Sequence, residues 1–490
     1  MALDHKDVPW TSGRSGKKGR AHTKGRPLDE QAWTEVKDLL GDRPRRRDLL
    51  IEHLHLIQDR YGHLSAPHLR ALAEEMRLSM AEVWEVASFY AHFDLVKEGE
   101  TPPPDLTIRV CDSLSCELAG SEALITALES GMDPAKVRVL RAPCMGRCDT
   151  APVVELGHRH VDNATPALIE DVIAGGDFHP IMPEYEDLTA YQARDGYDKL
   201  AQYRDGGDWE QVQDMLLSAG LRGLGGAGFP SGKKWGFVRA EAGPRYLAVN
   251  GDEGEPGTFK DRYHLEREPH VFLEGMLIAA WAVEADKCFI YMRDEYPAVL
   301  KLLRKEIAAL EEAGIVEAGY IDLRRGAGAY ICGEESALIS SCEGKRGEPT
   351  TKPPFPAVSG YLGFPTIVNN VETVAAVPWI INNGAASYKQ FGTEKSTGTK
   401  LWSVSGPVCN QGVFEIPLGM PFAEFFRDYL GGMRDGEEMK ACIVGGSSVP
   451  VLTAEEIMGC TLDYESLQQA GTMLGSGGMI IIPKSCSMVE

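Results

Sequence analysis

The N-terminal part of the chain places apolar residues at the spacing of amphipathic helices. Leu50, Leu54 and Ile57 recur at i, i+4 and i+7, which puts them on one helix face. Further along, Ser79 opens a Ser-x-x-Glu capping box, a sequence that predicts the start of another helix. We therefore predict a helical domain over residues 28–103, ended by a run of prolines.

The pattern changes after these prolines to that of a mixed α/β unit. Residues 106–110, 137–140 and 153–156 form short apolar runs that are typical of buried strands. Residues 122–128, in contrast, have helical spacing. These elements predict a small α/β domain over residues 104–178.

A stretch rich in Pro, Tyr, Asp and Gly follows, and we predict a linker over residues 179–215. Beyond it, strands and helices alternate, which predicts a layered α/β domain over residues 216–397. The elements expected around and within this domain are a helix at 209–219, strands at 246–249 and 288–292, and helices at 270–285 and 297–313.

The last part of the sequence is rich in strands and turns. A small β-grasp-like (ubiquitin-like) domain over residues 398–478 fits this pattern. Its expected elements are strands at 401–404, 412–416 and 441–444 and a helix at 421–429. The sequence therefore predicts an α/β multidomain protein.

Length and composition agree with several globular domains. The chain has 490 residues, 43% of them hydrophobic and 25% charged, which excludes wholesale disorder and gives a prior of about three domains. No apolar stretch approaches the length of a membrane helix, and no signal peptide is recognisable. We expect a cytoplasmic protein that does not enter a membrane.

The formal net charge of −22 argues against nucleic acid as a partner, because phosphate binding needs a basic face. Residues 1–27 form a locally basic tail. A solvated tail and an arm that docks onto an acidic partner subunit are both compatible with this composition. The basic residues concerned are Lys6, Arg14, Lys17, Lys18, Arg20, Lys24 and Arg26.

The cysteines give the first chemical signal. Their number, 11, is odd, so a disulfide scaffold is not expected. Cys111, Cys116, Cys144 and Cys148 have the spacing C-x4-C-x27-C-x3-C, with each pair in a loop directly after a predicted strand. Two such loops can bring four thiolates to one point, which favours an iron–sulfur cluster of the [2Fe–2S] type. A zinc site and four unlinked buried cysteines are the alternatives.

Glycine-rich and polar loops give the second signal. Gly223, Gly225, Gly226 and Gly228 satisfy G-x-G-x-x-G, although a helix rather than a strand precedes them. An aromatic and lysine-containing continuation runs to Trp235. Glycines let backbone amides approach a phosphate, and aromatic rings can stack on a flat cofactor. A simple flexible turn is the alternative for the glycine motif alone.

Four further segments have a similar character. An acidic turn at 250–260 follows a predicted strand, and its carboxylates and amide suit the hydroxyls of a ribityl chain or a ribose. The other segments are 325–335, 352–356 and 369–373. Each alone has an ordinary structural explanation, such as a solvated turn or acids in a first helical turn. Together they predict a pocket for a flavin and a nucleotide.

These motifs carry a resemblance to known families. Residues 216–478 resemble the NADH-oxidising flavoprotein subunit of respiratory complex I, and residues 28–178 resemble its thioredoxin-like [2Fe–2S] subunit. Fused in one chain, the two resemble the β (diaphorase) subunits of cytoplasmic NAD-dependent formate dehydrogenases and of NAD-linked hydrogenases. The segments 47–59 and 111–116, together with Leu224, most resemble the formate dehydrogenase version.

The resemblance implies site residues. FMN would be held by Gly223, Gly225, Gly226, Lys234, Asn250, Asp252, Glu253, Gly333, Glu334, Asn369, Asn370 and Thr373. The adenine of NAD(H) would stack among Phe229, Phe237 and Phe355, and the dinucleotide would be bordered by Glu255, Tyr330, Glu335 and Lys352. The four cysteines Cys111, Cys116, Cys144 and Cys148 would bind the [2Fe–2S] cluster. No residue is expected to act as an acid or base, because the hydride would pass directly between FMN and the nicotinamide.

One departure from the family pattern stands out. The family continues into a C-terminal helical bundle whose C-x2-C-x2-C motif and distant cysteine bind a [4Fe–4S] cluster. We expect residues 479–490 to be the stub of that bundle in a truncated sequence, because the ligands are absent and Cys486 alone cannot supply them.

The implied partner is a catalytic α subunit that carries a molybdenum or tungsten pterin site and further iron–sulfur clusters. Formate would be oxidised there, and its electrons would reach FMN and then NAD⁺ on this chain. A hydrogenase or complex I partner is an alternative with the same local chemistry. A non-catalytic assembly scaffold and a zinc-containing nucleotide-binding regulator are alternatives of another class.

Overall fold

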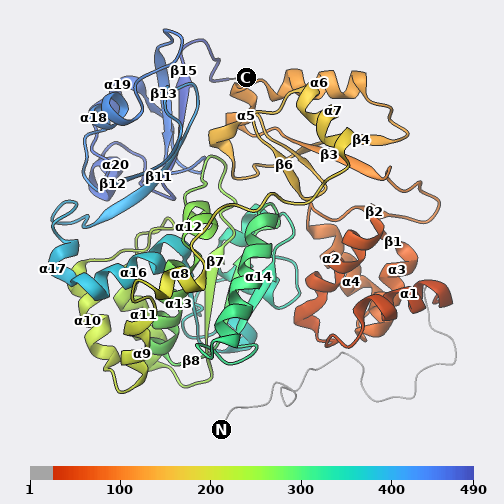
Figure 1. The fold of residues 1–490 in the computed structure, drawn as a ribbon, viewed down its shortest axis with the longest axis horizontal. Helices are drawn as coiled ribbons and strands as arrows, with labels where there is room; N and C mark the ends of the chain where they lie inside the picture. The colour runs from red at the N-terminus through yellow and green to blue at the C-terminus, as the bar shows by residue number, and fades with distance from the viewer. Residues whose placement is uncertain (1–25, 490) are drawn as a thin grey trace.

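The computed structural model describes residues 26–489, and four packed domains make up this part of the chain (Figure 1). Apart from Arg26, the basic residues of the predicted tail lie outside the described residues. Within residues 26–489, no helix is both long and apolar enough to cross a lipid bilayer.

The helical domain contains α1 (Glu30–Leu40), α2 (Leu50–Tyr61), α3 (Ala66–Glu75) and α4 (Met80–Phe89). The predicted capping box is present: the Ser79 side chain accepts from the Glu82 amide, and the Glu82 carboxylate accepts from the Ser79 amide. Two short parallel strands, β1 (Leu64–Ser65) and β2 (Leu95–Val96), tie the end of this domain back to its middle.

The second domain, here called the four-cysteine domain, is a sheet with the order β4-β3-β5-β6. Strands β3 and β4 pair in parallel, so their carboxyl ends, and the loops that follow them, lie at one edge of the sheet. The strands are β3 (Leu106–Cys111), β4 (Val137–Ala142), β5 (Val154–Leu156) and β6 (Arg159–Val161). The helices are α5 (Leu114–Leu118), α6 (Ser121–Gly131) and α7 (Pro166–Gly175).

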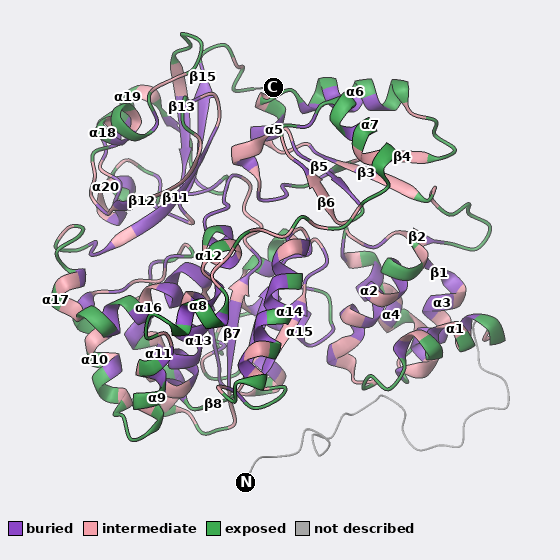
Figure 2. Cartoon of the chain, viewed as in Figure 1, coloured by how far each residue is buried: buried purple, intermediate pink, exposed green. Residues whose placement is uncertain are grey.

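The central domain is built on a parallel sheet with the order β10-β7-β8-β9. Alternate residues of β7 (Arg245–Gly251) point to opposite faces. Leu247 and Val249 share a core with α13 (Pro269–Val283) and α14 (Pro297–Glu312), whereas Tyr246 and Ala248 share a core with the helical domain. Most residues of β7 and β8 are therefore buried (Figure 2).

The strands of the central domain are β7 (Arg245–Gly251), β8 (Ala285–Met292), β9 (Ile321–Arg325) and β10 (Thr366–Asn370). Its helices are α11 (Ser231–Ala240), α12 (Asp261–Arg267), α13 (Pro269–Val283), α14 (Pro297–Glu312), α15 (Glu335–Cys342), α16 (Val371–Asn383) and α17 (Ala385–Tyr388).

The segment predicted as a linker, residues 179–215, instead folds onto the central domain. It contains the short helices α8 (Leu188–Gln192) and α9 (Asp198–Arg204) and most of α10 (Trp209–Ala219). Leu188 and Leu200 are buried in the same core as α13 and α14. The polar composition misled the prediction, because a few apolar residues of this segment, among them Leu188, Leu200 and Val212, are enough to anchor it in the core.

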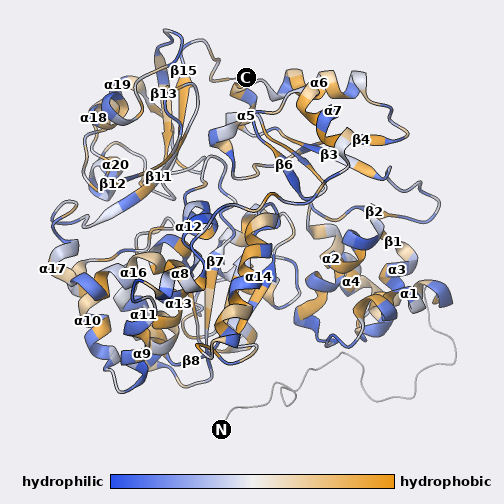
Figure 3. Cartoon of the chain, in the orientation of Figure 1, coloured by the Kyte–Doolittle hydropathy of each residue, from blue (hydrophilic) through white to orange (hydrophobic). Residues whose placement is uncertain are grey.

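The C-terminal domain is a five-stranded sheet with the order β12-β11-β15-β13-β14. Residues 479–483, predicted to open a helical bundle, instead belong to β15, which lies buried in the middle of this sheet. Its run of isoleucines is among the strongly apolar stretches of the chain (Figure 3). The strands are β11 (Thr399–Ser405), β12 (Gly412–Pro417), β13 (Met439–Val444), β14 (Leu452–Thr453) and β15 (Gly478–Pro483). The helices are α18 (Phe422–Glu424), a π-helical turn (Phe425–Tyr429), α19 (Ala454–Met458) and α20 (Tyr464–Gln469).

The buried carboxylate of Glu306 holds residues 179–215 against the central domain through hydrogen bonds. Glu306 of α14 accepts hydrogen bonds from the Tyr185 hydroxyl at 2.6 Å, from His270 Nε2 at 2.9 Å and from the Leu188 amide at 3.3 Å. Glu306→Ala is therefore expected to lower the free energy of unfolding by about 3 kcal/mol, because buried donors lose their acceptor. Urea unfolding measures this loss, and Glu312→Ala, an exposed change on the same helix, is the control.

If Glu306→Ala and Glu312→Ala unfold at the same urea concentration, the hydrogen bonds to Glu306 do not hold residues 179–215 in place. Limited proteolysis within residues 179–208 should also become faster in Glu306→Ala alone.

Candidate functional site

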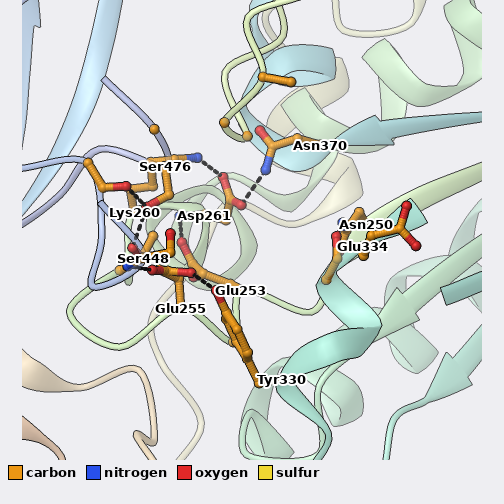
Figure 4. Close-up of a pocket in the computed structure, with 18 of the residues that line it drawn as sticks. Asn250, Glu253, Glu255, Lys260, Asp261, Tyr330, Glu334, Asn370, Ser448 and Ser476 are labelled. Atoms are coloured by element: carbon orange, nitrogen blue, oxygen red, sulfur yellow. Dashed lines mark hydrogen bonds and ion pairs between the residues drawn. The ribbon is translucent and has the colours of Figure 1, made fainter. Parts of the chain in front are cut away.

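A cavity of about 450 Å³ opens where the carboxyl ends of β7 and β10 meet loops of the C-terminal domain (Figure 4). This is the edge of a parallel sheet at which α/β domains usually bind ligands. The volume lies in the range of cofactor pockets. Of the residues predicted to hold a flavin or a nucleotide, the cavity is lined by Gly225, Gly226, Asn250, Glu253, Glu255, Tyr330, Gly333, Glu334 and Asn370.

A hydrogen bond to the start of α16 holds the glycine loop, residues 223–228, at the edge of this cavity. The Leu224 amide donates to Thr373 Oγ1 at 2.8 Å, which ties the loop to the first turn of α16. A Cβ on Gly225 would lie 2.8 Å from the Asn370 side chain, and Gly226 has a φ of +150°. Thr373 therefore positions the loop, and the two glycines allow the backbone to approach a ligand closely.

Two buried polar side chains have atoms without protein partners, and each is next in sequence to a residue that lines the cavity although neither lines it itself. Asp252 Oδ2 and Asn369 Nδ2 are fully buried, and neither atom makes a hydrogen bond in the described part of the chain. Burial raises the pKa of Asp252 to about 8. A buried polar atom without a hydrogen-bond partner destabilises the folded protein unless a ligand or a water molecule supplies that partner. The two atoms therefore favour a ligand that forms hydrogen bonds.

Glu253, in contrast, uses its carboxylate to build the acidic turn. The side chain accepts from the Asp261 amide at 2.6 Å, from the Arg262 amide at 3.2 Å and from the Tyr296 hydroxyl at 2.8 Å. Burial and the nearby charge of Asp261 raise the pKa of Glu253 to about 7. It lines the cavity while holding the start of α12 in place.

Two lysines and two glutamates predicted for the site form ion pairs with one another. Lys234 Nζ lies 3.0 Å from Glu335 and donates to the Val368 carbonyl at 2.8 Å. Lys352 Nζ lies 2.6 Å from Glu334 and 3.3 Å from Glu335. Only Glu334 of these four lines the cavity. The group joins α11, α15 and the segment around Lys352 at the rim.

Aromatic rings lie exposed outside the cavity. Phe229, Phe237 and Phe355 are 46%, 56% and 56% exposed, and the first two rings have centroids 6.2 Å apart. Within the cavity, the Tyr330 hydroxyl donates to Glu255, whose carboxylate also accepts from the Ser448 amide at 2.6 Å. Large exposed rings beside a polar cavity are available to stack on a flat ligand.

The sequence-based prediction missed the contribution of the C-terminal domain. Lys260 and Asp261 at the end of the acidic turn were also not singled out, although both line the cavity. The missed residues of the C-terminal domain are Gly445, Ser448, Met473, Gly475 and Ser476. Two signals could have found four of these five residues: the glycine–serine runs 445–448 and 475–478 each adjoin an apolar strand.

The four predicted metal-binding cysteines converge at the edge of the four-cysteine domain. Cys111 ends β3, Cys116 lies in α5, and Cys144 and Cys148 lie in the loop after β4. All four are buried, and the sulfur atoms of Cys144 and Cys148 are 3.4 Å apart. Hydrogen bonds with Cys116 and Cys144 raise the pKa of Cys111, so the thiols of both loops interact. A set of four thiolates from two loops fits a [2Fe–2S] cluster.

The cysteine loop packs directly against the central domain. Cys144 and Cys148 form one apolar cluster with Phe259 of the acidic turn. The buried Arg293 donates to the Cys144 carbonyl and, at 2.7 Å, to the Glu253 carbonyl. One arginine thus joins the cysteine loop to the wall of the cavity.

Comparison with known proteins agrees with this geometry. The Nuo51 FMN-binding domain model matches residues 216–379, and the thioredoxin-like [2Fe–2S] ferredoxin model matches residues 36–176. The NADH-quinone oxidoreductase F 2 subunit of Rhizobium meliloti is 42% identical over 64% of this chain and 78% of its own length. The chain belongs to the Nuo51 FMN-binding family.

Other relatives of this family are hydrogenase components. NADP-reducing hydrogenase subunit HndC of Solidesulfovibrio fructosivorans is 44% identical over 62% of this chain and 64% of its own length. An NAD⁺-reducing [NiFe]-hydrogenase structure superposes with a TM-score of 0.77 at 34% identity, over 91% of this chain and 79% of that one. The chain is thus an NADH-oxidising, FMN- and [2Fe–2S]-dependent electron-transfer subunit of the kind found in multi-subunit complexes.

The cavity and the cysteine site fit the two cofactors of the family. The unpartnered atoms of Asp252 and Asn369 suit the hydrogen-bonding edge of a flavin or its ribityl chain, and the two-loop cysteine set suits [2Fe–2S]. The sequence-based expectation of these cofactors and of a multidomain α/β fold is confirmed.

Cys144→Ser is expected to remove most of the cluster, because an alcohol is a poor replacement for a thiolate ligand. Visible absorption and the iron content of the purified protein measure the loss. Flavin content should change little. Cys409→Ser alters an exposed cysteine and serves as the control. Equal iron in both variants would contradict the assignment.

Proposed function

We propose that this chain is the diaphorase subunit of a metal-dependent formate dehydrogenase. It would pass electrons between an iron–sulfur-containing catalytic partner and NAD(H), in either direction. The observation that carries the electron-transfer part is the contact between the two cofactor sites through Arg293 and Phe259. The catalytic partner would carry a molybdenum or tungsten pterin site.

Bound FMN supplies the chemistry that connects two-electron hydride exchange with single-electron transfer to iron–sulfur centres. The chain's own residues bind and orient. Asn250, Asp252 and Asn369 would hydrogen-bond the flavin or its ribityl hydroxyls, and Lys234 would add positive charge near the phosphate. The glycine loop and Gly333 would allow close backbone approach, while Glu253, Glu334, Asn370 and Thr373 would hold the surrounding turns in place.

The nicotinamide nucleotide would enter past the exposed rings. Phe229, Phe237 and Phe355 would stack around the adenine, and Glu255 and Tyr330 would accept or donate hydrogen bonds to ribose hydroxyls. Glu335 and Lys352 would border the opening. No side chain would transfer a proton to the reacting carbon, so orientation is the main contribution of the protein.

Three sequence features support formate as the ultimate electron donor: the helix 47–59, the cysteine loop 111–116 and Leu224 in the glycine loop. A hydrogenase partner is a second candidate, favoured by the superposition with an NAD⁺-reducing [NiFe]-hydrogenase over 91% of this chain. The two candidates differ in the partner and not in the chemistry of this chain.

Phe355→Ala is expected to raise KM for NADH about fivefold with kcat unchanged, because a lost stacking contact is worth about 1 kcal/mol. Steady-state reduction of an artificial acceptor by NADH measures both constants. Val358→Ala, a similarly exposed change three residues away, is the control. Equal KM values for NADH in Phe355→Ala and Val358→Ala would contradict the assigned adenine site.

The partner is tested on the complex purified with its native subunits. Under anaerobic conditions, formate should reduce NAD⁺, and hydrogen gas should not. If hydrogen gas reduces NAD⁺ and formate does not, the formate assignment is wrong and the partner is a hydrogenase. Purified complex that contains flavin but does not bleach with NADH would instead favour a scaffold, and a colourless protein with zinc would favour the regulator.

A further inference from the structure

A second group of potential metal ligands lies away from the flavin cavity, where three domains meet. His55 comes from α2, His92 follows α4, and Asp294 follows β8 of the central domain. One ligand atom from each lies within 4.8 Å of the other two. His55 and Asp294 are buried, whereas His92 is partly exposed and leaves a path for an ion.

The surroundings of His55 bond one nitrogen of its imidazole ring and leave the other available to bind a metal ion. Its Nε2 lies 2.8 Å from the Gly326 carbonyl, which can only accept, so this nitrogen carries the hydrogen. Nδ1 therefore presents a lone pair, and this buried atom has no partner in the described part of the chain. Metal-binding histidines commonly donate the other ring N–H to a backbone carbonyl in this way.

Asp294 has a similar arrangement. One oxygen lies 2.6 Å from His92 Nδ1, and the other accepts from Arg325 Nε. Arg325 is in turn paired with Asp59 at 2.6 Å, so the guanidinium charge is largely balanced. The carboxylate is thus oriented by a neighbour on its outer side, as ligating carboxylates are in metal sites.

Charged side chains of both signs surround the group, Arg325 on one side and acidic residues on the other. Glu155 of the four-cysteine domain is buried nearby, and burial together with the charge of Asp294 raises its pKa to about 7. Glu155 therefore brings a carboxyl group of the four-cysteine domain to the same junction, beside Asp294.

We propose that His55, His92 and Asp294 form a binding site for Zn²⁺ or a similar divalent transition metal that joins the helical domain to the central domain. Two imidazoles and one carboxylate with an open fourth position are a common zinc ligand set. The site is separate from the cysteine cluster and from the flavin cavity, and its role is to strengthen the junction of the domains.

The test uses the oxidised holoprotein with its flavin and iron in place. The protein is incubated with Zn²⁺ and desalted, and zinc and iron are measured together by mass spectrometry. The wild-type chain should retain about one zinc per chain, and its thermal unfolding temperature should rise with zinc. His55→Ala and the nearly isosteric Asp294→Asn should bind zinc at least tenfold more weakly.

His53→Ala is the matched control. His53 lies on the same helix, is buried, bonds a backbone carbonyl through Nε2 and has an unpartnered Nδ1, but it is not part of this ligand group. Iron and flavin content of each sample shows that it is folded. Zinc retained equally by wild type, His55→Ala and Asp294→Asn would overturn the proposal, as would a wild-type protein that retains none.

Discussion

The cavity that is predicted to hold FMN depends on a group of buried charges, two of which, Lys260 and Asp261, belong to its lining. Lys260 Nζ lies 2.6 Å from Asp261 and 2.8 Å from Glu372, and Lys400 Nζ lies 3.3 Å from the same oxygen of Glu372. All four side chains are buried. Although burial alone would raise the pKa of Glu372, Lys260 and Lys400 hold it below its usual value. Removing one member would leave a buried charge unpaired, at a cost of about 3–5 kcal/mol.

This charge network connects several of the segments that form the cavity. Asp261 accepts from Asn370 Nδ2 at 2.6 Å, which joins the acidic turn to the end of β10. Lys400 donates to the Leu224 carbonyl at 2.8 Å, and the Leu401 amide donates to Glu372 at 2.7 Å. The glycine loop, the acidic turn, the first turn of α16 and the C-terminal domain are therefore held in one arrangement, and the C-terminal domain is needed to complete the cavity.

The acidic turn, residues 250–260, also packs against the loop that carries Cys144 and Cys148. Phe259 precedes Lys260 and packs against Cys144 and Cys148, while Arg293 spans from the cysteine loop to Glu253. Because the acidic turn touches both cofactor sites, any change in its position would affect both. The cysteine loop and the wall of the cavity are therefore in direct contact within a single chain.

Much of this could be predicted from sequence because the signals were local. The helix 209–219, the Ser79 capping box and the four-cysteine spacing each depend on residues close together in the chain, and each agrees with the structure. The network around Lys260 could not be predicted, because Glu372 and Lys400 approach it only in the folded domain. The segment 179–215 and β15 were misassigned since their packing partners also lie far away in sequence.

The buried network, and not the surface loops alone, shapes the flavin site. Glu372→Gln keeps the size of the side chain and removes its charge, without altering a residue that lines the cavity. The decisive measurement is the FMN dissociation constant of this variant, determined by flavin fluorescence on protein with intact iron content. We predict a constant at least tenfold higher than that of the wild type. An unchanged constant in a stably folded variant would contradict this role of the network.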